Sequence, residues 1–374
     1  MKKKIVYIIN HFRPGAIPNI LKDIAPHISN EFDVKVLSLQ KFNKEPSLFD
    51  EFEKIGVEVQ SLNVNKCQLI STFHKLRQFI REQKPDIIHS HLGRADFFSA
   101  ICKNRSSRLI TTFHSMQSNY NHITKLSYYF TNRLADHRTS VSDAVRDSWK
   151  SNSSNCDNIT IYNPVSINDY SEKIINNGLK ESLGISKQDS IIINVGNLKK
   201  QKGQIYLVRA FYEVLKTKPN TSLVIVGRSG DAEKELLSEV KKLDIENKVH
   251  LIGFRKDISQ LLNLSDVFVF PSKSEGLGIS VLEAMASKTP VVASDLPSIS
   301  EYISENETGF LVKYDDINEM SSKIIRILED ESLKDFIVNK AFDKVQKEFN
   351  PIVIANNYLS LYNKVLKQTK SEIN

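Results

Sequence analysis

The stretch VFVFPSKSEGLGISVLEAMASKTPVVASD, from Val267 to Asp295, carries the clearest fold signal in this chain of 374 residues. It contains a short apolar run, a loop with Gly276 and Gly278, a helical segment, and a second apolar run that begins at Pro290. Apolar runs that alternate with helical segments are typical of parallel strands covered by helices on both faces. The stretch therefore predicts a strand, a helix and a second strand of one parallel sheet.

The same alternation extends over the whole chain and restarts after Tyr162, where a polar, turn-rich segment indicates a link between domains. We predict an α/β fold of two doubly wound Rossmann-like domains that face each other across a cleft, with ligands beyond the carboxyl ends of the strands. The predicted domains are residues 1–165 and 166–351, and a helix at about residues 352–374 is expected to pack back on the first domain. The predicted strands begin at Lys4, Asp33, Val57, Asp86, Arg108, Arg138, Asn158, Ile191, Ser222, Val249, Val267 and Pro290.

Glycine is scarce in this chain and unevenly distributed. There are 13 glycines, roughly half of what average usage predicts, and Gly196, Gly227, Gly276 and Gly278 each follow a predicted strand. A glycine at that point lets the backbone approach a ligand and directs helix N–H groups at an anion. We therefore expect a nucleotide diphosphate in the second domain, although tight turns alone would explain any one of these glycines. The dinucleotide fingerprint and the P-loop motif are both missing, which argues against a nicotinamide dehydrogenase and a P-loop NTPase.

The positive charge belongs to the first domain. Residues 1–165 hold 23 Lys and Arg against 15 Asp and Glu, a balance of +8, whereas the whole chain has a net charge of +7. Such a field indicates an anionic partner, either nucleic acid or membrane lipid, or it is only a solubility bias. The basic stretches lack interleaved aromatic residues that stack on bases, so no nucleic-acid partner is expected. The basic residues considered for contact with lipid are Lys2, Lys3, Lys4, Lys75, Arg77, Arg81, Lys103, Arg105 and Arg108.

Cysteine usage and hydropathy indicate the compartment. Cys67, Cys102 and Cys156 are too far apart for a metal knuckle or a redox motif, which fits a reducing environment. The apolar run from Ile5 to Ile9 is too short for a signal peptide, and no stretch approaches the roughly 20 apolar residues that span a bilayer. We therefore expect a cytoplasmic protein, with peripheral contact at the anionic inner face of the plasma membrane.

Two glutamates mark the opening stretch as a site for a sugar and a nucleotide. Glu275 lies in the loop after the strand, and Glu283 lies eight residues later on the predicted helix. A carboxylate accepts hydrogen bonds from a ribose diol, as acidic residues do in other nucleotide sites, which leaves Glu275 for a sugar hydroxyl. Glutamates on a helix are usually only solvated, but the glycine loop and the flanking strands favour a site here.

The segment resembles the E-x7-E signature of retaining glycosyltransferases of family 4, also called glycosyl transferases group 1, which have the two-domain B-type fold. Further segments follow in the order typical of that family. They are GAIPNIL from Gly15, DIIHSH, TTFHS, SVSDAV, YNPVSI, NVGNLKKQKG, VIVGRSG and LIGFRKDI. The similarity covers nearly the whole chain and implies a retaining hexosyltransferase.

The resemblance also implies roles for single residues. His114, Lys202 and Glu275 are expected to be catalytic: His114 faces the transferred sugar, and Lys202 stabilises the leaving diphosphate together with the N–H groups of Gly278 and Ile279. The residues expected to bind the donor are Gly15, Ala16, Asn197, Lys202, Arg228, Phe254, Arg255, Gly278, Ile279 and Glu283. Within this set, Phe254 and Arg255 correspond to the nucleobase site and Glu283 to the ribose site.

The sequence departs from the family pattern at two loops. Asn197 stands where the family usually has an arginine, so the charge at the diphosphate would have to come from Lys199, Lys200 or Arg228. Gly15 and Ala16 replace a glycine pair, and Pro18 replaces a common glutamate. His89 and His91 share one face of a predicted strand, but without a third nearby ligand they predict strand-end structure rather than a metal site.

The resulting hypothesis is a metal-independent retaining glycosyltransferase of bacterial cell-surface polysaccharide synthesis, of lipopolysaccharide or capsule. It would move a hexose or N-acetylhexosamine from a nucleotide diphosphate sugar, with UDP as the expected nucleotide, to a glycan or lipid-linked acceptor. No cofactor is expected, and no Asp-x-Asp motif is present. The alternatives are a sugar-nucleotide epimerase of similar fold and a catalytically silent glycan-binding homologue.

Overall fold

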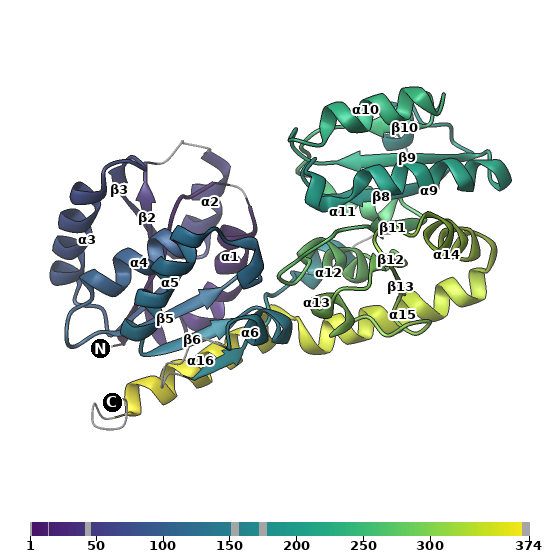
Figure 1. Cartoon of the computed structure of the whole chain (residues 1–374). Helices are drawn as coiled ribbons and strands as arrows, with labels where there is room; N and C mark the ends of the chain where they lie inside the picture. The colour runs from purple at the N-terminus through teal and green to yellow at the C-terminus, as the bar shows by residue number, and fades with distance from the viewer. Residues whose placement is uncertain (1, 14, 42–45, 151–156, 172–177, 369–374) are drawn as a thin grey trace. The chain divides into compact units, whose positions relative to one another are not determined.

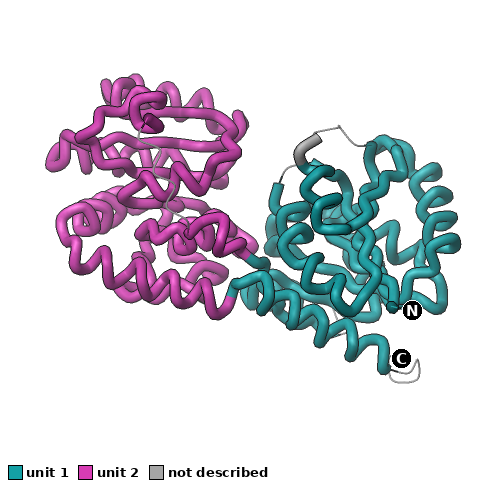
Figure 2. Tube along the Cα trace, turned by 180° about the vertical axis from the view of Figure 1, so that it is seen from behind, with its two compact units in different colours: residues 1–164, 349–374 teal, residues 165–348 magenta. Residues whose placement is uncertain are grey.

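The computed structural model describes residues 2–13, 15–41, 46–150, 157–171 and 178–368. The chain divides into two compact units (Figures 1 and 2): unit 1 is residues 1–164 with 349–374, and unit 2 is residues 165–348. The predicted boundary after residue 165 lies one residue from this division, and the predicted C-terminal helix belongs to unit 1. Residues 369–374 of that predicted helix, and 172–177 of the predicted link, lie outside the described residues.

Unit 1 is built on a parallel sheet of seven strands in the order β3-β2-β1-β4-β5-β6-β7. Its strands are β1 (Lys3–Ile9), β2 (Phe32–Gln40), β3 (Glu58–Val64), β4 (Ile87–His91), β5 (Arg108–Phe113), β6 (His137–Ser140) and β7 (Asn158–Thr160). Its helices are α1 (Ala16–Ile28), α2 (Pro46–Lys54), α3 (Leu69–Gln83), α4 (Gly93–Cys102), α5 (His122–Leu134), α6 (Asp143–Ser148) and α16 (Pro351–Lys367), with a short 3₁₀ turn η1 (Gln117–Asn119).

The alternation of side chains along each strand supplies two buried faces. Val6 and Ile8 of β1 pack with Leu76 of α3 and Phe98 of α4 in one apolar core. On the other face α16 lies along α1, and its Tyr362 contacts Tyr7 of β1 and Phe32 of β2. Because both faces are covered, the central strands β1, β4, β5 and β6 are buried along most of their length.

The face under α16 contains a buried polar layer. The hydroxyl of Tyr362 lies 2.7 Å from His89 Nδ1 and 2.9 Å from the hydroxyl of Tyr7. His89 Nε2 lies 2.7 Å from Thr112 Oγ1, which in turn lies 2.7 Å from Thr139 Oγ1. Burial lowers the pKa of His89 to about 3, so this imidazole is neutral in the folded protein. These bonds link α16 to four strands of the sheet, β1, β4, β5 and β6, and join the last helix to the first strand.

Unit 2 repeats this architecture with six parallel strands in the order β10-β9-β8-β11-β12-β13. Its strands are β8 (Ser190–Val195), β9 (Thr221–Val226), β10 (Val249–Leu251), β11 (Val267–Phe270), β12 (Val291–Ser294) and β13 (Phe310–Val312). Its helices are α7 (Ile167–Ser171), α8 (Leu179–Ser182), α9 (Gln204–Thr217), α10 (Glu233–Lys242), α11 (Ile258–Asn263), α12 (Ile279–Ala286), α13 (Pro297–Ser300), α14 (Ile317–Glu329) and α15 (Glu331–Glu348), with a 3₁₀ turn η2 (Lys200–Lys202). Two parallel, helix-covered sheets confirm the predicted α/β class.

Two parts of unit 2 differ from what the sequence predicted. Strand β13 was not expected, because three residues are too few to show a periodic pattern, and it pairs with β12 at the edge of the sheet. The segment expected as a polar link contains the short helices α7 and α8, and α7 packs on α12. Part of the presumed link is therefore built into unit 2.

The loops after β8 and β11 approach each other closely at Gly203. The backbone there is left-handed, with φ +67°, and an added Cβ would lie 2.0 Å from the carbonyl oxygen of Pro271. Only glycine permits both the conformation and the contact. The main chain of Lys273 also donates to the carbonyl of Gln201 at 2.8 Å. Gly203 therefore permits the close contact between the loops that follow β8 and β11.

Among the described residues, no helix is both long enough and apolar enough to cross a membrane.

We predict that Gly203→Ala destabilises unit 2 more than Gly184→Ala does. Both glycines are left-handed, with φ +67° and +73°, but nothing lies within 4 Å of an added Cβ at Gly184. The expected losses in unfolding free energy are roughly 2 to 4 kcal/mol for Gly203→Ala and about 1 kcal/mol for the control, measured by chemical denaturation. Equal losses would show that the loop contact contributes nothing.

We predict that His89 makes stability fall as the pH drops. Its pKa is lowered on folding, so the unfolded chain takes up the proton first and stability is lost below the ordinary histidine pKa. The expected contribution is about 2 kcal/mol between pH 7 and pH 5, measured by denaturation of the wild type and of His89→Gln. The variant should show the weaker pH dependence, and His74→Gln on the exposed side of α3 serves as the control. A pH dependence unchanged by His89→Gln would contradict the assignment.

Candidate functional site

The carboxyl edge of the sheet in unit 2 has a point where the strand order reverses. Strands β8 and β11 are neighbours there, although β9 and β10 come between them in sequence. The loops that follow β8 and β11 therefore leave the same edge of the sheet side by side. In doubly wound sheets this switch point is where ligands bind.

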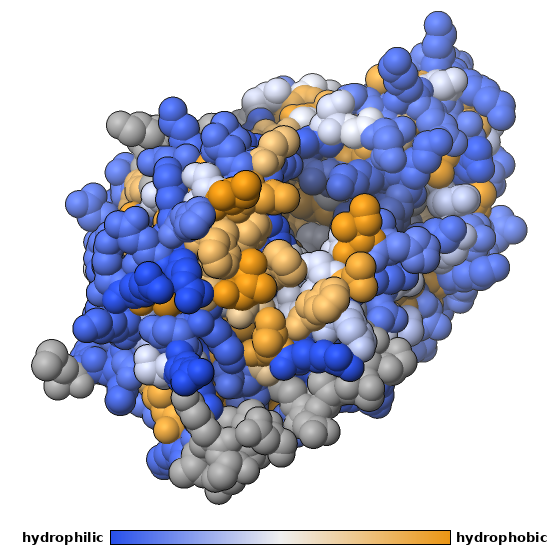
Figure 3. Space-filling view, turned by 60° about the vertical axis from the view of Figure 1, so that its left-hand side comes forward, coloured by the Kyte–Doolittle hydropathy of each residue, from blue (hydrophilic) through white to orange (hydrophobic). Residues whose placement is uncertain are grey.

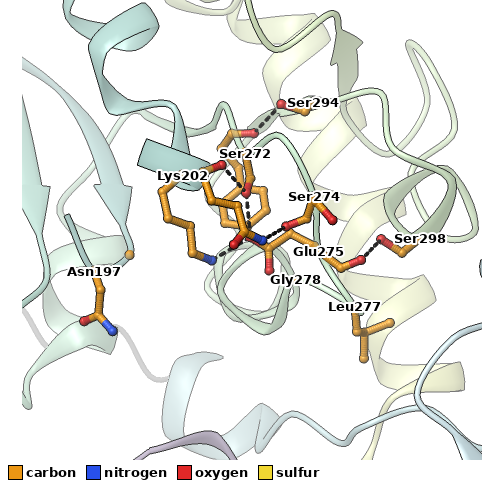
Figure 4. A network of polar contacts seen from close by, with 12 residues as sticks. Asn197, Lys202, Ser272, Ser274, Glu275, Leu277, Gly278, Ser294 and Ser298 are labelled. Carbon is orange, nitrogen blue, oxygen red and sulfur yellow. Dashed lines mark hydrogen bonds and ion pairs between the residues drawn. The ribbon is translucent and has the colours of Figure 1, made fainter. Parts of the chain in front are cut away.

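An ion pair occupies this edge. Lys202 Nζ donates to Glu275 Oε1 at 2.6 Å, and Ser272 Oγ donates to the same oxygen at 2.6 Å (Figure 4). The side chains of Lys202 and Glu275 are only 24% and 14% exposed. The ammonium also lies 5.1 Å from the centre of the Phe270 ring. The structure thus joins two of the three predicted catalytic residues, which are 73 positions apart in sequence.

Backbone contacts hold both loops in place around the pair. Gln201 Nε2 donates to the carbonyl of Ser274 at 2.5 Å, and Ser298 Oγ donates to the carbonyl of Glu275 at 3.1 Å. Figure 4 shows these contacts surrounding the glutamate from several loops. The carboxylate is therefore positioned by its own main chain as well as by Lys202.

Helix α12 begins directly after this loop. Gly278 precedes it in a left-handed conformation, with φ +78°, and Ile279 is its first residue. Tyr302 donates to the carbonyl of Leu277 at 2.7 Å, which fixes the turn. The first N–H groups of a helix have no partner within it and carry a partial positive charge. The start of α12 and Lys202 therefore form an electropositive corner next to Glu275.

Glu283 lies on α12, one of the elements that follow β11. Burial raises the pKa of its carboxyl, and a hydrogen bond to Tyr170 of α7 opposes that rise. A half-buried carboxyl at this position can accept hydrogen bonds from the hydroxyls of a ligand. The packing of α12 against α7 explains why α7, which precedes β8 in the sequence, belongs to unit 2.

The remaining donor-site candidates of unit 2 follow β8, β9 and β10. The main-chain N–H of Arg228 donates to Asn197 Oδ1 at 3.1 Å, and the Arg228 guanidinium stacks 4.0 Å above the centre of the Phe254 ring. Arg255 instead donates two hydrogen bonds to Asp257, at 2.8 and 2.5 Å, which raise the pKa of the guanidinium. Within the described residues Arg228 has no ion-pair partner, whereas the charge of Arg255 is balanced.

The candidates of unit 1 lie at the carboxyl ends of its strands. Gly15 and Ala16 open α1 after β1, and Gly15 has an extended backbone with φ 164°. His114 follows β5, and its Nε2 lies 3.0 Å from His91 Nδ1. Burial lowers the pKa of His114 to about 3, so this imidazole is neutral at physiological pH. His114 is thus in unit 1, while the pair of Lys202 and Glu275 is in unit 2.

Two polar partners were not assigned from the sequence. Ser272 shares Glu275 Oε1 with Lys202, and its position two residues after the end of β11 was the available signal. His91 contacts His114 because β4 and β5 are parallel neighbours, with His91 opposite Thr112. His89 is paired by Tyr362 and Thr112, in agreement with the structural interpretation of this histidine. In the part of the chain that the structure describes, no group of three His, Cys, Asp or Glu is placed to hold a metal ion.

This arrangement suits the binding and departure of a phosphorylated group. A lysine and a helix N-terminus stabilise negative charge, and preorganised donors act most strongly on charge that develops during reaction. A fixed carboxylate beside them orients a hydroxyl group by accepting its hydrogen bond.

Comparison with known proteins supports this chemistry. The model for "Glycosyl transferases group 1" matches residues 176–344, and that for "Glycosyltransferase Family 4" matches residues 20–169. The chain is 23% identical over 359 residues, 89% of each protein, to the Escherichia coli UDP-Gal:alpha-D-GlcNAc-diphosphoundecaprenol alpha-1,3-galactosyltransferase. It is 30% identical over 212 residues to the Bacillus anthracis N-acetyl-alpha-D-glucosaminyl L-malate synthase, an alignment that covers 57% of this chain and 55% of that protein.

A shorter match is closer in sequence. The chain is 37% identical over 191 residues to the Campylobacter jejuni N,N'-diacetylbacillosaminyl-diphospho-undecaprenol alpha-1,3-N-acetylgalactosaminyltransferase. This alignment covers 50% of this chain and 48% of that protein.

Solved structures share the fold. The Anabaena protein Alr3699/HepE in complex with UDP and glucose superposes with a TM-score of 0.85 at 22% identity, covering 97% of this chain and all of that one. WaaG, a glycosyltransferase involved in lipopolysaccharide biosynthesis, superposes with a TM-score of 0.73 at 14% identity, covering 96% of this chain and 99% of that one. The two family models together account for most of the chain, and the chain belongs to the family 4, group 1 glycosyltransferases of the B-type fold.

Proposed function

We propose that the chain transfers a hexose or N-acetylhexosamine from a UDP-sugar to a lipid-linked or glycan acceptor in cell-surface polysaccharide synthesis. The observation that carries the proposal is the 2.6 Å contact between Lys202 and Glu275 at the switch point of unit 2, beside the start of α12. The names of the Escherichia coli and Campylobacter jejuni relatives, both of which describe diphospho-undecaprenol acceptors, support the choice of acceptor.

This proposal assigns one role to each group at the carboxyl edge of the sheet in unit 2. Lys202 and the N–H groups of Gly278 and Ile279 bind the diphosphate and stabilise the charge that builds on it. Glu275 accepts a hydrogen bond from a hydroxyl of the transferred sugar, and Glu283 accepts from the ribose. Asn197 is neutral, so Arg228, which stacks on Phe254 without a carboxylate partner among the described residues, supplies the additional positive charge.

We further propose that transfer retains the anomeric configuration and needs no metal ion. The bond between the anomeric carbon and the phosphate oxygen breaks, and the acceptor oxygen bonds to the same face of that carbon. The acceptor proton passes to the leaving phosphate, whose negative charge Lys202 and the helix N–H groups have stabilised. Neutral His114 is proposed to hydrogen-bond the transferred sugar from unit 1. The protein is proposed to act in the cytoplasm, in peripheral contact with anionic lipid at the inner face of the plasma membrane.

We predict that Lys202→Met and Glu275→Gln each lower kcat by about 100- to 1000-fold, the loss typical of one missing charge-stabilising contact. Release of UDP in the presence of acceptor measures the rate, and a thermal melt checks the fold. Arg209 and Glu239 of α9 and α10 form an ion pair of the same length, 2.6 Å, away from the strand ends. Glu239→Gln should therefore leave kcat unchanged. Full activity of Glu275→Gln would refute the site.

The reaction itself is tested with labelled donors. The protein is incubated with UDP-glucose, UDP-galactose, UDP-N-acetylglucosamine or UDP-N-acetylgalactosamine, with and without a lipid extract and with and without EDTA. We expect label in the lipid fraction only when lipid is added, no effect of EDTA, and an α-linked product by NMR. Conversion of the donor without acceptor would favour the epimerase alternative, and binding without transfer to any acceptor would favour the silent homologue.

A further inference from the structure

Helix α5 exposes most of its large apolar residues. Tyr128, Thr131 and Asn132 are buried against the rest of unit 1. The outward residues and their exposed fractions are Ile123 81%, Leu126 59%, Phe130 51% and Leu134 42%. Their spacing of three, four and four residues places them in one line along the helix. We call these four residues the α5 stripe.

The inner face of α5 already has its partners. Tyr128 packs on Phe113 and Trp149, with ring centres 5.2 and 4.9 Å apart, and α4 lies along the helix. The α5 stripe therefore does not contribute to the core of unit 1. Figure 3 shows apolar side chains gathered on one face of the molecule among hydrophilic ones. A contiguous exposed apolar surface of this kind usually marks an interaction site.

More apolar surface lies at the start of α3. Gly93 at the start of α4 is next to Thr124 of α5, and Arg94 donates to Thr72 Oγ1 of α3 at 2.8 Å. The first turns of α3 and α5 therefore flank the same end of α4. That turn of α3 exposes Leu69 and Ile70, two more large apolar side chains of unit 1.

The charged residues of helix α5 are all positive. Helix α5 contains Lys125 and Arg133 and no Asp or Glu, and the Arg133 guanidinium lies 4.6 Å from the centre of the Tyr129 ring. Three of the cations considered from the sequence are instead paired within the protein: Lys3 with Asp86, and Lys103 and Arg108 with Asp136. Positive charge next to exposed apolar and aromatic side chains is the pattern of helices that lie in a membrane interface.

We propose that the α5 stripe is the surface that docks on an anionic lipid bilayer, with Lys125 and Arg133 at the headgroups. The inference rests on the proposed function for its purpose, which is to bring a lipid-linked acceptor to the enzyme. At about 1.5 Å per residue the 13 residues of α5 are too short to span a bilayer, so the helix lies along the surface. A symmetric dimer through this face would place Lys125 and Arg133 near their copies, and like charges oppose such an interface.

The test is flotation with phosphatidylcholine vesicles that contain about 30% phosphatidylglycerol. We expect the wild type to float with these vesicles and to bind pure phosphatidylcholine vesicles much more weakly. The double variant Ile123→Ser, Phe130→Ser should partition roughly 100-fold less, about tenfold for each side chain removed. The charge variant Lys125→Glu, Arg133→Glu should lose binding to the anionic vesicles in particular.

The matched control removes the same kind of surface from unit 2. Leu237 of α10 and Phe336 of α15 are 51% and 48% exposed, so Leu237→Ser, Phe336→Ser should bind vesicles as the wild type does. Binding of UDP-sugar and the melting temperature establish that each variant is folded. Wild-type binding by the double variant would overturn the proposal. Loss of a dimer in that variant, seen by light scattering, would assign the surface to a second copy and would also overturn it.

The vesicle result does not depend on the transfer reaction. If no donor and acceptor pair gives product but the double variant still loses vesicle binding, the proposed function fails and the docking surface stands. If transfer to lipid succeeds and the double variant binds vesicles normally, the docking surface fails alone.

Discussion

The approach of two loops at Gly203 is the constraint on which the candidate site depends. The chain leaves β8, turns through a left-handed glycine and touches the carbonyl of Pro271 at the end of β11. A side chain at this position would force the loops apart. The contact between Lys202 and Glu275 exists because the main chain on both sides of the switch point comes so close. The ion pair is thus a consequence of backbone geometry, and the uncharged glycine next to Lys202 determines where that charge lies.

The parallel topology explains why much of the site was readable from the sequence. Residues that follow parallel strands meet at one edge of the sheet, so strand ends and glycines predicted a ligand site in the loops after β8, β9 and β11. The spacing of Glu275 and Glu283 is common by chance and predicted little without the glycine loop and the flanking strands. The family resemblance supplied Lys202 and Phe254 and the role of each residue, which the experiments above address.

Other features depend on contacts that no local pattern records. Strand β13 is held by pairing with β12 rather than by its own propensity. The contact of His91 with His114 requires the register of two neighbouring strands. Helix α5 departs from the usual rule, because its apolar periodicity marks the exposed face, whereas its buried residues are Tyr128, Thr131 and Asn132. Periodicity alone would have predicted that the apolar face of this helix is buried.

The placement of α16 has a consequence for how the protein forms. Unit 2 is one continuous stretch of chain, whereas unit 1 needs residues from both ends. During synthesis the sheet of unit 1 emerges first, but Tyr7 and His89 acquire the hydroxyl of Tyr362 only after more than 270 further residues have been made. Domains that are continuous in sequence fold as they emerge. The order of completion is therefore the reverse of the order of translation: unit 2 is finished first, and unit 1, which begins the chain, is closed last.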